Sequence, residues 1–460
     1  MIKRKLQTSL DSFRLFLAVS ELPHPLFLDS GMDPNRLGRW SLIMAAPFER
    51  IRIKGERIEL ENCLDGTQTT LQGNAFDFLK SRYERYQTER TPDFDLPFGG
   101  GMAGYFAYDL CHHVECLPRT AVDDVNIPDA VVGLYETAIL VDHQLKDVWL
   151  VEFDFRPGAE ARMDAFEARI REAEKNGLDL EPAWKTSTPV FESNFTKEDY
   201  LEAIRKIKRY IKSGDLYQVN MTQRFTAQMT DDPLMLYKKL RTINPAPFSA
   251  YMPFEEATII SSSPERFIQI RNGEIETRPI KGTRPRGKTP EEDAVESALL
   301  LASEKDRSEL LMIVDLERND LGKVAEVGSV KVPELFVIEE YPTVYHLVST
   351  VTATLRAGLS PIDLLRAAFP GGSITGAPKI RAMEIIDELE PTQRNLYTGS
   401  IGYIGFNGDT DLNIVIRTIV AKEGKAYFQV GGGIVWDSEE YAEYEETLHK
   451  ARALMKALSS

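Results

Sequence analysis

The chain has 460 residues, of which 43% are hydrophobic and 27% charged, and its net charge at pH 7 is −16. This composition is typical of a globular protein with enough chain for a large core or for two to three domains. The excess of acidic residues argues against a nucleic-acid partner, which needs a basic surface. It leaves a small anionic substrate open, because a local group of cations is enough to bind one.

The N-terminal segment 1–22 begins with basic residues, but its apolar part is short and Arg14 interrupts it. It lacks the features of a signal peptide, and no stretch reaches the roughly 18 apolar residues of a membrane-spanning helix. Three cysteines in so long a chain suit a reducing compartment. We therefore expect a cytoplasmic protein that has no membrane partner.

One segment rich in cysteine and histidine, CHHVEC at 111–116, suggests a metal site at first sight. It lacks the paired spacing of zinc ligands, and no second pair of ligands follows it. We interpret it as a loop or as the end of a strand.

The first part of the chain ends with β-like runs at 130–141 and 147–153 and a polar helix at 158–175. Segment 176–194 is rich in turn-forming residues and has no periodicity, which is typical of a linker. The linker predicts two regions, an N-terminal region at 1–180 and a C-terminal catalytic region at 193–460.

The C-terminal region contains helical patterns with recognisable ends. Thr196 can cap a helix whose apolar residues keep helical spacing until Gly214 ends it. A second helical stretch is predicted over 289–318, with a capping box at its start and a break at Ser303. The remaining helices are predicted at 376–391 and 437–458.

Short β-like runs separate these helices. The predicted strands are 257–262, 267–270, 329–337, 399–406, 413–420 and 426–430. Helices and strands are interleaved around what we predict to be a large, mostly antiparallel sheet system. The fold class predicted from this pattern is α+β.

Segment 276–287, ETRPIKGTRPRG, places Lys281 in a stiff turn with Arg278, Arg284 and Arg286 nearby. Repulsion between like charges disfavours the ammonium form of a lysine, and a lysine nucleophile needs such activation. A basic surface turn without a chemical role explains the same residues, and the segment taken alone favours that interpretation.

Two predicted helices carry carboxylates that could share a cation. Glu439, Glu443, Glu446 and Lys450 lie on one stripe of the last helix, and Glu309 lies on the helical stretch before it. Mg²⁺ takes one or two protein carboxylates together with water and substrate oxygens. If the two helices meet, they can form a magnesium site; otherwise the stripe is a solvated acidic face.

Segment 369–379, FPGGSITGAPK, is a glycine-rich turn that leads directly into a helix. Exposed backbone N–H groups and the positive end of a helix dipole favour an anion there. Ala377 stands where a P-loop has its lysine, so a carboxylate suits the turn better than a nucleotide phosphate. A second cluster, GGGIV at 431–435, allows a close approach of the backbone or forms a strand-to-helix turn.

Seven segments together resemble the chorismate-utilising enzymes, a family that includes anthranilate, isochorismate, salicylate and aminodeoxychorismate synthases. The segments are PIKGTR, KDRSELLMIVDLERND, PGGSITGAPK, GSIGY, IRT, GGGIV and EYEETLHK. The resemblance is dense over 193–460 and looser before it, where FGGGMAGYFAYDL at 98–110 carries it.

The resemblance implies chorismate, a dicarboxylate, as the substrate and Mg²⁺ as the cofactor. It implies Glu309 and Glu446 as metal ligands, with Glu443 behind them. His346 is either an active-site histidine of the family or a histidine satisfied in the core. The substrate contacts that the resemblance implies are Thr283, Thr375, Gly376, Tyr403, Arg417, Gly432 and Lys450.

Two positions select a branch of the family. Anthranilate synthases have alanine at the position of Lys281, whereas the branch that aminates ring carbon 4 has lysine. In the mechanism implied, Lys281 attacks ring carbon 2, Glu265 protonates the leaving hydroxyl, and ammonia then adds at carbon 4 and expels the lysine. Gln218 stands where isochorismate and salicylate synthases have a lysine base, which disfavours water as the nucleophile. The implied product is 4-amino-4-deoxychorismate, a precursor of p-aminobenzoate and folate.

The ammonia requires a source. No segment around the three cysteines resembles the Cys–His–Glu arrangement of glutamine amidotransferases, so a separate amidotransferase subunit in a heterodimer is implied. Family members often bind an aromatic amino acid in the N-terminal region, and the resemblance implies a tryptophan pocket here. LFLDSG at 26–31 departs from the family pattern for feedback inhibition, so a structural tryptophan or an empty pocket fits as well. The pocket residues expected by position are Ser30, Leu37, Trp40, Pro247, Phe248 and Ser249.

Other functions stay open at this stage. The large subunit of anthranilate synthase, from tryptophan biosynthesis, is the first alternative, and Lys281 argues against it. A chorismate-binding subunit without catalysis is the second, and the presence of Lys281, Glu265, Glu309 and Glu446 together argues against it. An isochorismate-forming enzyme is the third.

Overall fold

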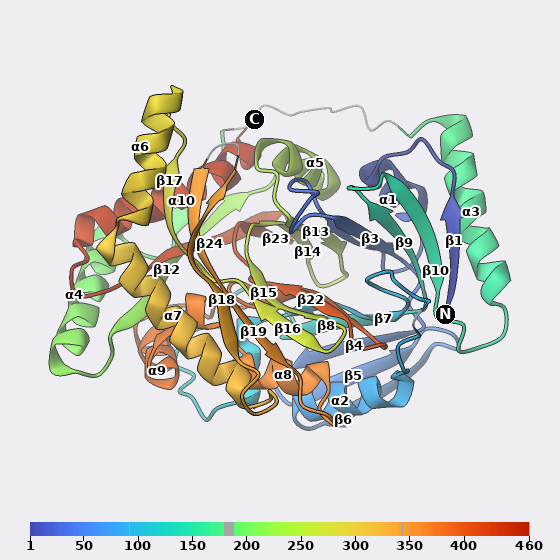
Figure 1. Ribbon diagram of the computed structural model, residues 1–460, viewed down its shortest axis with the longest axis horizontal. Coiled ribbons are helices and arrows are strands. Elements are labelled where there is room, and N and C mark those ends of the chain that lie inside the picture. The colour runs from blue at the N-terminus through green and yellow to red at the C-terminus, as the bar shows by residue number, and fades with distance from the viewer. Residues whose placement is uncertain (92, 179–187, 342–343, 460) are drawn as a thin grey trace.

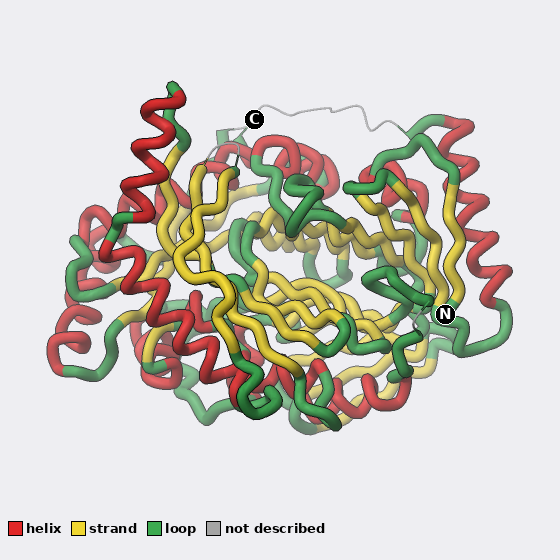
Figure 2. Tube along the Cα trace, viewed as in Figure 1, coloured by secondary structure: helices red, strands yellow, loops and turns green. Residues whose placement is uncertain are grey.

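Two large antiparallel sheets form the frame of the protein in the computed structural model, which describes residues 1–91, 93–178, 188–341 and 344–459. The sheets lie across from one another, and helices cover their outer sides (Figures 1 and 2). One apolar cluster contains residues of both sheets, among them Leu42 and Ile259 of the first sheet and Tyr105 and Ile401 of the second. The α+β prediction is confirmed.

The first sheet has the strand order β1-β10-β9-β3-β2-β13-β14-β23-β24-β12-β11, with β20 paired to β12. Its strands are β1 (Ile2–Leu6), β2 (Leu26–Asp29), β3 (Trp40–Met44), β9 (Thr137–Asp142), β10 (Asp147–Glu152), β11 (Glu192–Ser193), β12 (Gln218–Gln228), β13 (Phe248–Pro253), β14 (Thr258–Ser263), β20 (Gly376–Ala377), β23 (Thr418–Lys422) and β24 (Lys425–Ile434).

The second sheet has the strand order β17-β19-β16-β15-β22-β21-β7-β8-β4-β5-β6, with β18 paired to β19. Its strands are β4 (Glu49–Lys54), β5 (Arg57–Asn62), β6 (Thr67–Gln72), β7 (Gly101–Phe106), β8 (Ala130–Tyr135), β15 (Arg266–Arg271), β16 (Glu274–Thr277), β17 (Ile280–Pro285), β18 (Lys331–Glu340), β19 (Val344–Thr354), β21 (Ser400–Gly405) and β22 (Thr410–Asn413).

Helices pack on both sheets: α10 lies on β24, α4 and α9 lie on β12, and α7 lies on β19. Their bounds are α1 (Ser12–Val19), α2 (Ala75–Tyr86), α3 (Ala159–Asn176), α4 (Lys197–Ser213), α5 (Pro233–Ile243), α6 (Pro290–Leu301), α7 (Glu304–Gly322), α8 (Pro361–Ala368), α9 (Lys379–Leu389) and α10 (Glu440–Leu458), with short 3-10 turns η1 (Tyr108–His113) and η2 (Gly372–Ile374). Within the described ranges, no helix is long and apolar enough to cross a membrane.

Local capping explains where several helices begin and end. The Thr196 side chain accepts a hydrogen bond from Asp199 N at the start of α4, and Gly214 ends that helix at a φ of 86°. Ser303 caps α7, which confirms the predicted break, although α7 continues to Gly322. The start of the last helix was predicted wrongly, because Glu439 rather than Asp437 is its N-cap.

Two long predicted strands are each two strands, because the chain crosses from one sheet to the other within them. Segment 130–141 divides into β8 of the second sheet and β9 of the first, and 413–420 divides into β22 of the second and β23 of the first. Arg417 lies in the second crossing with a left-handed φ of 53°. Glu265 lies in a third crossing, between β14 and β15.

Three other predictions of local structure are corrected. Segment 276–287 is not a turn around Lys281, because 280–285 forms β17 and pairs with β19. Glycines 431–433 lie inside β24 and pair with β12 rather than forming a strand-to-helix turn. Residues 108–113 form a 3-10 turn, which contains the first half of the CHHVEC segment.

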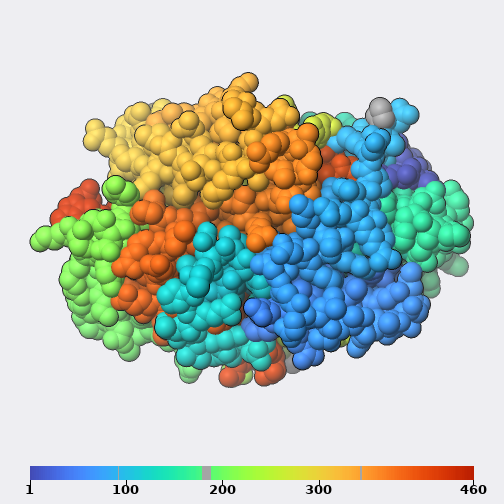
Figure 3. Space-filling view, turned by 90° about the horizontal axis from the view of Figure 1, so that it is seen from below, coloured from blue at the N-terminus to red at the C-terminus, as the bar shows by residue number. Residues whose placement is uncertain are grey.

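The two predicted regions share both sheets. Strand β2 pairs with β13 in the first sheet, and β7 pairs with β21 in the second. Blue N-terminal and orange C-terminal segments also lie side by side on the face seen in Figure 3, where α2 packs against α8. The boundary between 1–180 and 193–460 stays a prediction, and residues 179–187 of the expected linker lie outside the described residues.

Candidate active site

Lys281 points its amine toward the glycine-rich turn. Its Nζ donates a hydrogen bond to the backbone oxygen of Ser373 at 3.1 Å. Burial lowers the pKa of Lys281, while the carboxylates of Glu309 and Glu265 act in the opposite direction and the Lys450 ammonium adds to the lowering. A neutral amine is therefore favoured relative to an exposed lysine.

The arginines near Lys281 do not supply the repulsion that the sequence suggested. Arg278 pairs with Glu339 at 2.6 Å, Arg284 pairs with a carboxylate at 3.1 Å, and Arg286 pairs with Asp293 at 2.5 Å. Each of these charges is compensated locally. The lowered pKa of Lys281 therefore comes mainly from burial and partly from Lys450, and the arginines were the wrong source of the predicted repulsion.

Glu265 faces the same turn from the crossing between the two sheets. It is only 6% exposed, and Ser373 Oγ donates a hydrogen bond to its Oε1 at 2.7 Å. Burial raises the pKa of Glu265, although the hydrogen bond from Ser373 and the charge of Lys281 oppose the shift. The carboxyl can hold a proton closer to neutral pH than an exposed glutamate can, as a general acid requires.

Ser373 thus contacts both Lys281 and Glu265, with its backbone oxygen and its hydroxyl respectively. Buried Arg394 fixes the turn, since its Nη1 donates to Ile374 O at 2.9 Å. Gly376 has a φ of 151°, and a Cβ there would lie 2.2 Å from Gln218 O, so only glycine fits. Ser373 was not predicted from the sequence, because its two contacts come from segments far away in the chain.

Three charged residues of α10 surround Gly432 of β24. A Cβ on Gly432 would lie 3.5 Å from both Glu443 Oε2 and Glu446 Oε1, and 3.6 Å from Lys450 Nζ. Lys450 Nζ also lies 2.7 Å from Glu446 Oε1. Burial opposes ionisation of Glu446, but the Lys450 ammonium keeps the pKa of this carboxyl below its ordinary value. The absence of a side chain at Gly432 leaves space between these groups.

The carboxylates of α7 and α10 meet, as a shared cation site requires. Lys305 Nζ lies 3.9 Å from Glu309 Oε1 and 3.6 Å from Glu443 Oε1, so a cation already bridges the two helices. Glu309 Oε1 is buried without a hydrogen-bond partner, and burial raises the pKa of this carboxyl. In the described part of the chain, no three His, Cys, Asp or Glu side chains are grouped closely enough to hold a metal ion. The unpartnered Glu309 Oε1 is an oxygen of the kind that a hard cation binds.

Arg417 joins this group from the other sheet crossing. Its Nη1 donates to Lys450 O at 3.1 Å, and burial lowers the pKa of its guanidinium. Buried Tyr397 is near enough for the charges of Arg417 and Glu265 to affect its pKa, although burial is the main reason that this pKa is raised. Tyr397 therefore lies near Arg417 and Glu265, and it was not predicted from the sequence.

Tyr403 lies elsewhere. It lines a separate cavity beside Trp40, and its ring makes an edge contact with Phe98 at 5.4 Å between centroids. Tyr403 therefore lines the cavity beside Trp40 rather than the site of Lys281, and the prediction that it contacts the substrate there is corrected.

The remaining predicted contacts form two smaller groups. Thr283 Oγ1 and His346 Nδ1 lie 2.8 Å apart across β17 and β19. Burial lowers the pKa of His346 to about 4, so its ring is neutral at pH 7. The Thr375 hydroxyl donates to Gly371 O at 2.9 Å and so stabilises the turn.

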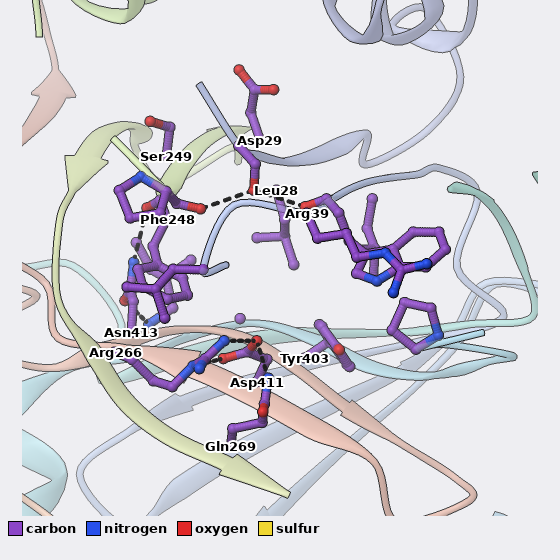
Figure 4. A pocket seen from close by; sticks show the side chains of 18 of the residues that line it. Leu28, Asp29, Arg39, Phe248, Ser249, Arg266, Gln269, Tyr403, Asp411 and Asn413 are labelled. Carbon is purple, nitrogen blue, oxygen red and sulfur yellow. Dashed lines mark hydrogen bonds and ion pairs between the residues drawn. The ribbon is translucent and has the colours of Figure 1, made fainter. Parts of the chain in front are cut away.

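The six residues expected to form a tryptophan pocket all line one cavity of about 230 Å³. The cavity lies between the two sheets, with Asp29, Phe248 and Ser249 on one side and Arg266 and Asp411 on the other (Figure 4). Ser30 Oγ lies 2.8 Å from Trp40 O and 2.9 Å from Pro247 O. Arg266 Nε donates to Asp411 Oδ1 at 3.0 Å, so the polar wall is already paired.

The CHHVEC segment has structural contacts of its own. Cys111 is buried, whereas Cys116 is exposed. His113 Nε2 lies 3.0 Å from Gly55 O, and its Nδ1 accepts a hydrogen bond from Ala75 N at 3.2 Å. These contacts connect the 3-10 turn to the second sheet and to α2.

Comparison with known proteins extends over nearly the whole chain. The chorismate binding enzyme family matches residues 26–456. Aminodeoxychorismate synthase component 1 of Klebsiella aerogenes is 46% identical over 97% of this chain and 96% of its own length. Anthranilate synthase component 1 of Pseudomonas aeruginosa is 38% identical over 97% and 92%.

A solved structure shows the same architecture. Anthranilate synthase component I from Streptococcus pneumoniae TIGR4 has a TM-score of 0.80 and 32% sequence identity, over 91% of this chain and 92% of that one. The family match and the relatives agree with the arrangement of the two sheets around Lys281, Glu265 and the carboxylates of α7 and α10. The chain belongs to the chorismate-binding enzyme family.

Proposed function

We propose that this chain converts chorismate and ammonia to 4-amino-4-deoxychorismate, as the chorismate-processing component of aminodeoxychorismate synthase. The observation that carries the proposal is the buried Lys281 amine, joined to the buried Glu265 carboxyl through Ser373. A nucleophile and a proton donor held on opposite sides of one residue suit a substitution in which one group adds while another leaves. Relatives that are 45% to 46% identical to this chain carry the name of this enzyme.

The chemistry of Lys281 and Glu265 balances in two stages. The lone pair of the Lys281 amine forms a bond to ring carbon 2, the two ring double bonds shift, and the carbon 4 hydroxyl leaves as water with the proton of Glu265. Ammonia then bonds to carbon 4, the double bonds shift back, and the electron pair of the carbon–nitrogen bond returns to Lys281. A proton from the new ammonium group restores the Glu265 carboxyl.

Cations and carboxylates around Gly432 position the two carboxylates of the substrate. Arg417 and Lys450 supply positive charge, and carboxylates of α7 and α10 beside them supply the ligands for a cation. Glu309 and Glu446 would hold Mg²⁺, with Glu443 behind them. When bound, Mg²⁺ neutralises a substrate carboxylate and fixes its place in the site.

Two further components belong to the proposal. Ammonia comes from a separate glutamine amidotransferase subunit, which agrees with the "component 1" in the names of the relatives. The cavity beside Trp40 binds tryptophan, whose indole suits the apolar lining and whose charged groups suit the polar wall. A cytoplasmic location remains a prediction from composition.

Product analysis tests the proposal. The purified chain is incubated with chorismate, Mg²⁺ and ammonium chloride, and the products are separated by chromatography. Formation of 4-amino-4-deoxychorismate only when ammonia is present is the expected result. Fluorescent anthranilate as the direct product would instead favour the anthranilate synthase relatives, and turnover without ammonia would favour isochorismate formation. Binding of chorismate with no turnover at high ammonia would indicate a subunit without catalysis.

A further inference from the structure

Two buried carbonyl oxygens on β12 have no hydrogen-bond donor: Gln218 Oε1 and Asn220 Oδ1. Gln218 is 1% exposed and Asn220 is 7% exposed, so bulk water does not satisfy them. A buried acceptor without a donor costs free energy, and native proteins rarely keep one without a reason. Two on one strand point to a ligand that donates to both.

The two side chains share one face of the sheet. They are two residues apart on β12, so they point the same way. Val219, which lies between them, and Met221, which follows Asn220, belong to the apolar cluster on the other face. Asn220 stands directly opposite Gly433 of β24. Residues directly opposite each other in an antiparallel pair project to the same face.

The space above Gly433 connects this pair to the reacting amine. A Cβ on Gly433 would lie 2.4 Å from Gln218 Nε2 and 3.6 Å from Lys281 Nζ. Any larger residue at 433 would fill the space beside Gln218 and Lys281. Gln218 therefore lies next to the reacting amine, and Asn220 lies on the same face of the sheet, opposite Gly433.

The chemistry of the pair selects the ligand. Two amide oxygens accept hydrogen bonds and neither is basic enough to take a proton from water. Ammonia can donate one N–H to each oxygen and keep its lone pair free for attack, with no base required. On the basis of the function proposed above, we infer that Gln218 and Asn220 form the binding site of the ammonia nucleophile.

Two apolar replacements test this inference, Gln218→Met and Asn220→Leu, which keep side-chain size and remove the acceptor. Initial rates are measured at one pH with ammonium chloride varied at saturating chorismate, and then with chorismate varied at saturating ammonium. Each variant is expected to raise the KM for ammonia about fivefold, because one hydrogen bond is lost. The KM for chorismate is expected to stay within about twofold of its original value.

A matched control lies on the same strand. Gln228 is exposed at the far end of β12, so Gln228→Met makes the same chemical change away from the site and is expected to leave both KM values unchanged. Circular dichroism confirms that each variant is folded, and either site variant alone is sufficient for the test.

Other outcomes separate this inference from the function on which it rests. If the unaltered chain forms no aminated product, the proposed function fails first. If it does, and the variants raise the KM for chorismate but not for ammonia, the pair binds a substrate hydroxyl and the inference is wrong. An unchanged KM for ammonia in both folded variants also overturns it.

Discussion

The site around Lys281 and the cavity beside Trp40 are built from the same two sheets but treat polar groups in opposite ways. Around Lys281, buried acceptors on Gln218, Asn220 and Glu309 lack partners. In the described residues, no side chain that lines the Trp40 cavity carries such an atom. Its Ser30 hydroxyl bonds to backbone carbonyl oxygens, and its Arg266 guanidinium bonds to Asp411.

This difference separates a site prepared for chemistry from one prepared for binding. Unpaired buried groups and shifted pKa values destabilise the fold and are kept where a substrate or a reaction uses them. A cavity whose polar walls are already paired can accept a ligand with little rearrangement but has no group poised to react. The predictions below test this contrast, beginning with the largest expected effect.

Replacement of the amine removes the reactive group from the first site. Lys281→Ala is expected to lower the rate of amination by about 10³-fold or more, because a nucleophile positioned beside its proton donor is lost. The measurement is the rate of 4-amino-4-deoxychorismate formation with ammonia. Phe248→Ala in the Trp40 cavity is the matched control, and a loss of similar size there would remove the distinction between the two regions.

Glu265→Gln is expected to separate activity from stability. Loss of the general acid should lower the rate by roughly 10²- to 10⁴-fold. The raised pKa of Glu265 means that the folded state holds this proton more tightly than the unfolded state. The stability of the original chain therefore falls as pH rises from the unfolded pKa through the folded pKa, and the variant escapes that loss.

Thermal unfolding measured between pH 4 and 8 checks the second half of this prediction. The melting temperature of Glu265→Gln should exceed that of the original chain by a margin that grows as pH rises. A margin that is constant with pH, or one that shrinks, would contradict the assigned shift.

Glu443 tests the acidic side of the same site. Its Oε1 accepts from Ser438 Oγ at 2.7 Å, and in the proposed site it lies behind the Mg²⁺ ligands. Glu443→Gln is expected to raise the Mg²⁺ concentration needed for half-maximal activity by about 10- to 100-fold. A titration of activity with Mg²⁺ after treatment with a chelator measures this shift. Glu440→Gln, on the same helix but paired with Lys208 of α4, provides a comparison that should not change.

The smallest effect is expected at the Trp40 cavity. L-Tryptophan at 100 times its Kd would stabilise the fold by about 2.7 kcal/mol, which is measurable as a rise of a few degrees in melting temperature. Phe248→Ala should abolish this rise in melting temperature, whereas Lys281→Ala should show the same rise as the original chain. A rise that is lost in Lys281→Ala but kept in Phe248→Ala would mean that tryptophan binds beside Lys281 and not in the Trp40 cavity.

The sequence predicted features that depend on neighbouring residues. The caps at Thr196 and Ser303 and the end at Gly214 follow from local hydrogen bonding and backbone freedom. The crossings between sheets at 136 and at 414–417 were missed, because an apolar run has the same pattern whether it stays in one sheet or passes to another. Residues at such crossings depend on the whole topology.

Only part of the site was predicted, because the rest of it also depends on the whole topology. Motifs placed Lys281, Glu265 and the acids of α7 and α10 in one group, and the structure brings them together. Motifs did not identify Ser373 or Asn220. Ser373 matters through its hydrogen bond to Glu265, which is distant in the chain, and Asn220 through a buried oxygen that lacks a hydrogen-bond partner. Tyr403 lies on β21 and lines the Trp40 cavity, whereas Tyr397 lies in the turn before that strand, and composition does not show which of the two cavities a tyrosine faces.

The most direct test is a mass spectrum of the intact chain mixed with chorismate and Mg²⁺ in the absence of ammonia, followed by peptide mapping. The account predicts an adduct derived from chorismate on Lys281, which is absent in Lys281→Ala. No adduct, together with continued amination by Lys281→Ala, would contradict it and would mean that ammonia attacks the ring directly.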